Sequence, residues 1–223
     1  MSINVAIDGP AGAGKSTIAR MLASELNYIY VDTGAMYRAM ALYMIEHKID
    51  VSHLDEVGSA CDAITIDIQY SAGEQQVILN GKNVNDFIRT ETVSEMSSKI
   101  SAIPEVREKL LSLQRSLAAA ENVIMDGRDI GTHVLPNADV KIFLTADAHV
   151  RAVRRYEEFI AKGVSCTLEN VEREVIERDE RDMNRAIAPL KQAEDAVRVD
   201  TSAMTIEEVV CYLKNLIGQA VAR

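Results

Sequence analysis

The segment GPAGAGKST at residues 9–17 constrains the fold more than any other part of the sequence. Gly9, Gly14, Lys15 and Ser16 match the pattern GxxxxGK(S/T), and the match lies between the apolar run INVAID and the helical pattern IARMLASEL. In such a unit, backbone N–H groups turn inward around an anion, the helix N-terminus adds partial positive charge, and the lysine reaches phosphate oxygens. The segment therefore predicts a nucleoside triphosphate site. The alternative is a glycine-rich turn that only connects a strand to a helix.

Short apolar runs alternate with helical patterns along most of the chain. Strands that are apolar throughout fit a parallel sheet that helices cover on both faces. The pattern therefore predicts a doubly wound α/β fold with five parallel strands. The expected strands are residues 3–8, 28–32, 122–126, 140–145 and 197–200, and the expected helices include 15–26, 36–47, 148–162 and 206–222.

Three segments depart from this simple alternation. Residues 64–84 contain alternating runs joined at SAGE and at Asn80-Gly81, which is a strong hairpin signal and predicts a small antiparallel sheet inserted in the core. A long amphipathic helix is expected from Pro104 onward, because proline is favoured at the first helical position. Residues 163–185 are highly charged and helical in period, and they predict a third, helical unit.

The composition is that of a globular domain, with 48 % hydrophobic and 26 % charged residues among 223. The 34 acidic and 24 basic residues give a net charge of −10, which argues against broad binding to nucleic acids or anionic membranes. The three cysteines are far apart and suggest reduced thiols. No run reaches the roughly 18 apolar residues that a membrane span needs. We therefore expect a cytoplasmic protein.

The second expected strand ends in polar residues. In YIYVDTGAMYRAM, residues 28–40, Asp32 and Thr33 follow the strand and Arg38 lies one turn into the next helix. Polar groups at the carboxyl end of a central strand lie in the ligand crevice, and an arginine there can bind a second phosphate. The alternative is a helix N-cap followed by a surface arginine.

The third expected strand carries the motif VIMDGRDIG, residues 123–131. Asp126 lies at the strand end, where a carboxylate can help hold Mg²⁺ directly or through water. Arg128 and Asp129 follow on a glycine-flanked loop, and together they offer donors and acceptors that suit a nucleobase or a ribose. The alternative is a structural ion pair.

The segment ERDERDMNR, residues 177–185, contains regularly spaced arginines. Arg178, Arg181 and Arg185 are three and four residues apart, so they are expected on one helical face with Asp182 among them. Three guanidinium groups could stabilise the charge that develops during phosphoryl transfer. The alternative is a solvated helix with internal salt bridges.

These motifs, together with VKIFLTA and the stretch NDFIRTETVSEMSSKISAIPEVRE, resemble the bacterial cytidylate kinases of the nucleoside monophosphate kinase family. The resemblance runs from residue 3 to the C-terminus. It implies transfer of the γ-phosphoryl group of ATP, with Mg²⁺, to CMP or dCMP. It also implies a monomer whose partners are these nucleotides, with no nucleic acid or membrane.

The resemblance also implies a set of site residues. ATP would be held by Gly9, Pro10, Ala11, Gly12, Ala13, Gly14, Lys15, Ser16, Thr17 and Arg154, although the arginine-rich run around Arg154 also fits a solvated helix. CMP would be held by Asp32, Thr33, Arg38, Arg89, Ser98, Arg107, Arg128, Asp129, Arg178, Asp182 and Arg185. Catalysis is expected from Lys15, Arg128, Arg178 and Arg181, and a metal site from Ser16 and Asp126. Family members often have Ser in place of Thr33, and some have Gly in place of Ser16.

The expected organisation is one P-loop kinase domain. Its core would comprise residues 1–38, 104–160 and 186–223. An acceptor-binding insert of antiparallel strands and helices would occupy residues 39–103, and a helical lid residues 161–185. Two kinds of protein other than a nucleotide kinase remain as alternatives: a P-loop kinase for a non-nucleotide acceptor, and a structural ATP-binding module. A GTPase-type switch is disfavoured because DEVG at 55–58 follows no strand and because the chain has no NKxD or TKxD segment.

Overall fold

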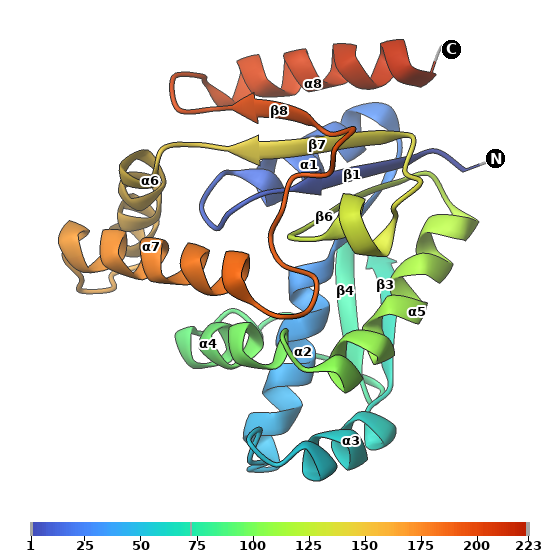
Figure 1. Cartoon of the computed structure of the whole chain (residues 1–223), viewed down its shortest axis with the longest axis vertical. Coiled ribbons are helices and arrows are strands. Elements are labelled where there is room, and N and C mark those ends of the chain that lie inside the picture. The colour runs from blue at the N-terminus through green and yellow to red at the C-terminus, as the bar shows by residue number, and fades with distance from the viewer. Residues whose placement is uncertain (1, 72, 222–223) are drawn as a thin grey trace.

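The computed structural model describes residues 2–71 and 73–221, and its centre is a five-stranded parallel sheet (Figure 1). The strand order is β2-β6-β1-β7-β8. The strands are β1 (Asn4–Asp8), β2 (Ile29–Asp32), β6 (Val123–Gly127), β7 (Val140–Thr145) and β8 (Val197–Asp200). Each lies within one residue of the strand expected from the sequence. The predicted doubly wound α/β fold is therefore confirmed.

Helices cover both faces of this sheet. Along β1, Val5 and Ile7 point into one hydrophobic core and Ala6 into the other, as the two-residue period of a strand requires. The first core is closed by α1 (Lys15–Leu26) and α8 (Ile206–Val221). The second is closed by α2 (Thr33–Glu46) and α5 (Pro104–Ala120), with Pro104 in the first turn of α5 as expected.

The insert contains a separate antiparallel sheet of β3 (Ile66–Ser71), β4 (Glu74–Leu79) and β5 (Lys82–Asn83). Asn80 and Gly81 both have positive φ angles and form the predicted turn between β4 and β5. The predicted SAGE turn includes residue 72, which lies outside the described residues. The insert was expected to contain helices as well as strands, but the sequence did not locate them; they are α3 (Leu54–Ala63) and α4 (Glu91–Ile100).

The charged unit near residues 163–185 forms α7 (Leu168–Asn184), which packs against α6 (Ala148–Ala161). A short π-helical turn, η1 (Ile130–Val134), follows β6. Helix α2 crosses the expected boundary between core and insert at residues 38 and 39 without a break. The division into core, insert and lid stays a prediction. Throughout residues 2–71 and 73–221, every helix is too short or too polar to cross a membrane.

Candidate active site

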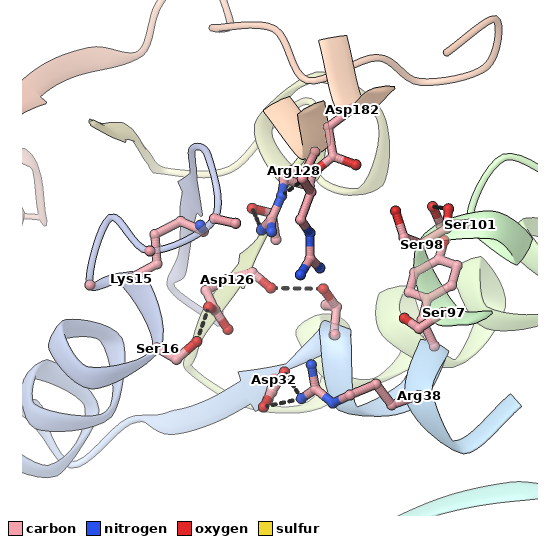
Figure 2. A pocket seen from close by; sticks show the side chains of 18 of the residues that line it. Lys15, Ser16, Asp32, Arg38, Ser97, Ser98, Ser101, Asp126, Arg128 and Asp182 are labelled. Atoms are coloured by element: carbon pink, nitrogen blue, oxygen red, sulfur yellow. Dashed lines mark hydrogen bonds and ion pairs between the residues drawn. The ribbon is translucent and has the colours of Figure 1, made fainter. Parts of the chain in front are cut away.

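A cavity of about 510 Å³ opens where β2 and β6 end, and α4 and α7 contribute to its walls (Figure 2). It brings together most of the site residues expected from the sequence. Those that line it are Ala11, Gly12, Gly14, Lys15, Ser16, Thr17, Asp32, Thr33, Arg38, Arg89, Ser98, Asp126, Arg128, Asp129, Arg154, Arg178, Asp182 and Arg185. Gly9, Pro10, Ala13, Arg107 and Arg181 are not among the lining residues.

The glycine-rich loop reaches the cavity through backbone conformations that favour glycine. Gly14 precedes α1 in the left-handed region, with φ 82°. Gly9 has φ 147°, and a Cβ atom there would lie 1.9 Å from the carbonyl oxygen of Leu144 on β7. Gly9 therefore lets the loop pass directly over the sheet, which explains why it supports the loop without lining the cavity.

Lys15 lies at the start of α1 with only 5 % of its surface exposed. Its Nζ donates a hydrogen bond of 2.6 Å to the carbonyl oxygen of Pro10. Burial, together with the positive charge of Arg128, lowers the pKa of Lys15 well below its usual value of 10.5. The site thus places a desolvated cation where a phosphate group would relieve its electrostatic cost.

Asp126, at the end of β6, accepts hydrogen bonds on both carboxylate oxygens. Oδ2 accepts from the hydroxyl of Ser16 at 2.8 Å, and Oδ1 accepts from the hydroxyl of Tyr30 at 3.1 Å. Burial and the neighbouring Asp32 carboxylate raise the pKa of Asp126. The hydroxyl of Thr33 donates to the Asp126 carbonyl at 2.7 Å, so the ends of β2 and β6 are joined at this point.

Asp32 begins α2 and holds two arginines. Its Oδ1 caps the helix by accepting from the Ala35 N–H at 2.8 Å. Its Oδ2 lies 3.0 Å from Nη2 of Arg38 and 3.3 Å from Nη2 of Arg89. Figure 2 shows the Asp32 and Arg38 side chains on the wall formed by the start of α2. The N-cap interpretation is therefore correct for this segment. The binding of a phosphate by Arg38 stays a prediction.

Asp129 lies between two arginines. Nη2 of Arg107 forms an ion pair with its Oδ2, and Nη2 of Arg185 lies 3.0 Å from its Oδ1. Arg107 also donates to the carbonyl oxygen of Ser101 at 3.2 Å, and its side chain is 6 % exposed. Because Arg107 sits behind Asp129 instead of on the cavity wall, its contact in this structure is with Asp129 and the segment after α4.

On α7, Asp182 accepts from Nε of Arg128 at 2.9 Å. Burial opposes the ionisation of Asp182, but the charges of Arg128 and Arg178 outweigh it and hold the pKa of Asp182 below its ordinary value. Arg178 lines the cavity, and its Nε finds no hydrogen-bond partner among the described residues. Burial and the charge of Arg128 lower the pKa of Arg178 to about 10. This corner of the cavity therefore carries excess positive charge.

Contrary to what the sequence led us to expect, Arg181 does not share the face of α7 that turns Arg178 toward the cavity. Arg181 is exposed, and its Nε donates to the carbonyl oxygen of Glu177 on the same helix at 3.3 Å. With 3.6 residues per turn, the fourth and seventh residues after Arg178 stay near its direction, whereas the third is rotated away by about 60°. Arg185 also lies just beyond α7, as its C-cap. Arg181 is therefore not among the residues that line the cavity in this structure.

Some residues of the site were not identified from the sequence. Asp8, at the end of β1, is buried and accepts from the N–H groups of Ile130 and Gly131 at 2.7 Å, so it anchors the loop that carries Arg128 and Asp129. Burial raises the pKa of Asp8 to about 6. Asp8 could have been identified by the signal that identified Asp126, which is an aspartate at the end of an apolar strand. Arg20, Ser97, Ser101, Glu158 and Lys162 also line the cavity.

Arg154 contributes to the cavity from α6. Its Nη2 donates to the carbonyl oxygen of Thr201 at 2.8 Å, and its Nη1 donates to the hydroxyl of Thr201 at 3.3 Å. These contacts tie the arginine to the segment after β8 while it remains on the cavity wall. Its expected contact with ATP stays a prediction.

The sequence was also compared with known protein families and with individual proteins. Residues 5–219 match the family model described as cytidylate kinase. A cytidylate kinase from Carboxydothermus hydrogenoformans is 51 % identical over 219 residues, which cover 97 % of this chain and 98 % of the relative. A cytidylate kinase from Bacillus cytotoxicus is 45 % identical, with 99 % and 98 % covered.

Among solved structures, a crystal structure of an uncharacterised protein from Eubacterium ventriosum is similar with a TM-score of 0.53 and 14 % identity, and covers 98 % of this chain and 99 % of that one. At this identity the likeness concerns the fold alone. The sequence relatives, in contrast, align with nearly every residue, including the loop, the insert and the arginine-bearing helix. The chain therefore belongs to the cytidylate kinase family.

Proposed function

We propose that this protein transfers the γ-phosphoryl group of ATP to CMP and dCMP, giving ADP and CDP or dCDP. One observation carries the proposal: a single cavity joins the glycine-rich loop to a cluster of arginines and to Asp129. Phosphoryl transfer requires a donor and an acceptor held in line, with positive charge around the moving group. This cavity has both features, and membership of the family supplies the identity of the two nucleotides.

The donor side is formed by the loop at residues 9–17. Its backbone N–H groups and Lys15 would hold the β- and γ-phosphates of ATP. Lys15 is positioned for this task because α1 begins at this residue, so its ammonium group and the helix N-terminus lie together. Binding of the phosphates would compensate the charge that burial makes unfavourable.

Arg38, Arg128 and Arg178 would hold the acceptor phosphate. Each lines the cavity, and Arg178 has a buried nitrogen without a partner among the described residues. As the phosphoryl group moves, these guanidinium groups would stabilise its negative charge, and no strong base is needed. Arg181 is not carried into this proposal, because it lies on the exposed face of α7.

Asp129 is proposed to read the cytosine. Its two oxygens are fixed by Arg107 and Arg185, so the carboxylate is held in one orientation in a cavity that Ser98 also lines. A carboxylate can accept from the exocyclic amine of cytosine, whereas the corresponding carbonyl oxygen of uracil has no proton to donate. Asp182 and Arg185 would contact the sugar.

Ser16 and Asp126 fit a Mg²⁺ ion held with the phosphates. Both offer oxygen atoms, which Mg²⁺ prefers, and both line the cavity beside Lys15. The described residues contain no group of three or more His, Cys, Asp or Glu side chains arranged for a metal. This suits an ion that takes most of its ligands from phosphate and water. When bound, Mg²⁺ neutralises charge on the phosphate oxygens.

Water must be kept from the donor phosphate, and the insert and α7 are proposed to close over both nucleotides. Equal rates of ATP hydrolysis with and without CMP would count against this closure. The other parts of the proposal are a monomeric state, a cytoplasmic location and no binding of nucleic acid. The net charge of −10 supports the last of these.

The test is ADP release with Mg-ATP and, separately, CMP, dCMP, UMP, AMP and GMP, for the wild type and for Asp129→Ala. We expect fast turnover with CMP and dCMP, slow turnover with UMP, and loss of this preference in the variant. Asp67→Ala, on the insert sheet and outside the cavity lining, is the matched control. Turnover with AMP or GMP instead would overturn the acceptor assignment.

The alternatives find no support in this geometry. DEVG lies within α3, remote from the strand ends of the main sheet, so the switch interpretation fails on position. A kinase for a non-nucleotide acceptor would show turnover with none of the five monophosphates in this assay, and a structural ATP-binding module would give the same result.

A further inference from the structure

The small sheet of the insert is attached to the free edge of the main sheet by a two-point contact. β2 is an edge strand, so the backbone groups of Tyr30 and Asp32 that face away from β6 need other partners. Oε1 of Gln75 accepts from the Asp32 N–H at 2.8 Å, and Nε2 of Gln75 donates to the Asp32 carbonyl at 3.2 Å. Only one orientation of the amide satisfies both contacts. The side-chain amide of Gln75 thus makes the two hydrogen bonds that a residue of a neighbouring strand would make with Asp32.

The neighbouring contact comes from the strand beside Gln75. Tyr70 on β3 pairs directly with Gln75 on β4, so both side chains lie on the same face of the small sheet. The hydroxyl of Tyr70 donates to the Tyr30 carbonyl at 3.1 Å. The backbone of β2 is therefore held at alternate residues, 30 and 32, by a cross-strand pair from the insert.

The backbone around Gln75 is held in place by Asn85, which lies in the segment after β5. Nδ2 of Asn85 donates to the Gln75 carbonyl at 2.8 Å, and Oδ1 of Asn85 accepts from the Val77 N–H at 2.8 Å. Asn85 thus extends the pairing of β4 beyond the two residues of β5. Because this contact fixes the backbone from which the side chain starts, Gln75 loses less conformational entropy when its amide contacts Asp32.

The residue that Gln75 holds is central to the acceptor side of the cavity. Asp32 caps α2 and binds both Arg38 and Arg89 through its carboxylate. Arg38 and Arg89 come from different parts of the chain, and both contact the Asp32 carboxylate. A shift of the Asp32 backbone would therefore move both guanidinium groups relative to the cavity.

We infer that Gln75 is a positioning residue for acceptor binding: by fixing the backbone of Asp32, it sets the place of Arg38 and Arg89. Gln75 does not line the cavity in the described part of the chain, so it acts through Asp32 and not by touching a nucleotide. The inference rests on the proposed function in one respect, because the acceptor is taken to be CMP. The contact itself can be tested without any nucleotide.

The adjacent residue gives a matched control. Gln76 has the same side chain on the same strand, but it points to the opposite face, where it accepts from Nδ2 of Asn83. We would compare Gln75→Ala and Gln75→Glu with Gln76→Ala and Gln76→Glu. The glutamate variants keep the volume of the side chain, and at position 75 they replace the donor to the Asp32 carbonyl by an oxygen.

Two measurements are made on the five proteins: steady-state kinetics with each nucleotide varied, and exchange of the Asp32 amide proton measured by NMR without nucleotide. For both Gln75 variants we expect the KM for CMP to rise about tenfold. Gln75→Ala loses both hydrogen bonds to Asp32, and Gln75→Glu loses one and places an oxygen against the Asp32 carbonyl. The KM for ATP should stay within about twofold, because the glycine-rich loop is not touched. The Asp32 amide should exchange faster, and both Gln76 variants should match the wild type.

Three results would overturn the inference. Unchanged exchange of the Asp32 amide in the Gln75 variants would show that Gln75 does not hold this backbone. An equal loss in CMP and ATP binding, with a lower melting temperature, would indicate general destabilisation. A Gln75→Glu variant with wild-type kinetics would mean that Gln75 only fills space. A wild-type protein inactive on CMP would contradict the proposed function alone, because the exchange measurement still decides whether Gln75 holds Asp32.

Discussion

Nζ of Lys15 donates a hydrogen bond of 2.6 Å to the carbonyl oxygen of Pro10, so the loop that would hold the donor phosphates also holds its own cation. Burial lowers the pKa of this lysine, which means that the folded protein disfavours its charged form. The charge of Lys15 therefore lowers the stability of the fold, and its place in the proposed donor-phosphate site would give that charge a function. Its removal should therefore separate activity from stability.

Lys15→Met is expected to reduce the turnover rate by about 10³-fold or more, because a charge that stabilises the transferring phosphoryl group is lost. Its melting temperature should equal or exceed that of the wild type, because an apolar side chain replaces a desolvated charge. Lys214→Met is the control, since Lys214 forms an exposed ion pair with Glu25. A large drop in the melting temperature of Lys15→Met would contradict this account of Lys15.

Gly9 and Gly58 should respond in opposite ways to alanine. At Gly9 a Cβ atom would lie 1.9 Å from the Leu144 carbonyl oxygen, so the loop must move, and we expect a loss of at least about 3 kcal/mol in the free energy of unfolding. At Gly58, inside α3, a Cβ atom meets nothing within 4 Å, and we expect a gain of about 0.5–1 kcal/mol. Urea unfolding measures both. Equal changes in the free energy of unfolding for Gly9→Ala and Gly58→Ala would contradict the close contact between Gly9 and Leu144 on β7.

Asp8 should make the stability of the protein depend on pH between about 4 and 6. Burial raises its pKa from 3.8 to about 6, so in this range the folded state binds more protons than the unfolded state. The contribution of Asp8 is therefore most favourable below pH 3.8 and declines by about 3 kcal/mol as the pH rises through 6.

The measurement is the free energy of unfolding of the wild type and of Asp8→Asn across pH 4–7. The wild type should lose stability relative to the variant as the pH rises, and the difference should become constant above about pH 7. A difference that grows in favour of the wild type over this range would mean that the hydrogen bonds from Ile130 and Gly131 outweigh burial at Asp8.

Arg151 and Asp179 should contribute to stability as a pair. Nη2 of Arg151 lies 2.6 Å from Oδ2 of Asp179, and its Nη1 donates to the Ala11 carbonyl at 2.9 Å, so the pair joins α7 to the glycine-rich loop. Asp179→Ala leaves a buried guanidinium group without an anion and should cost about 3–5 kcal/mol. In a double-mutant cycle, Arg151→Met should lower the free energy of unfolding less in the Asp179→Ala variant than in the wild type. A cost below 1 kcal/mol for Asp179→Ala would show that the pair is not what holds α7.

The sheet and its long helices could be predicted from the sequence for a physical reason. Strands β1, β2, β6 and β7 are mostly buried along their length, so their apolar runs stand out. INVAID, for example, ends at Asp8 in the structure as in the sequence pattern. Helix α3 was missed because it buries only Val57, Ala60 and Cys61 and contains a glycine. Helix α4 was missed although Thr90 caps it, because its buried positions include Ser97, which weakens the apolar pattern.

For the site, residues at strand ends were predictable and contacts between distant segments were not. Asp32 and Asp126 follow apolar runs directly, which places them at the carboxyl edge of the sheet. The contact between Gln75 and Asp32 joins residues 43 positions apart and depends on how the small sheet docks, so no local pattern encodes it. Arg181 was assigned wrongly to the cavity-lining face because spacing alone does not fix the direction of a side chain.

The central claim is most directly tested by ³¹P NMR of the wild-type protein with Mg-ATP and CMP. We predict that CDP and ADP appear together in equal amounts and that little inorganic phosphate forms. Formation of ADP with inorganic phosphate and no CDP would contradict the claim, because the cavity would then bind the donor without transferring its phosphoryl group to the nucleotide.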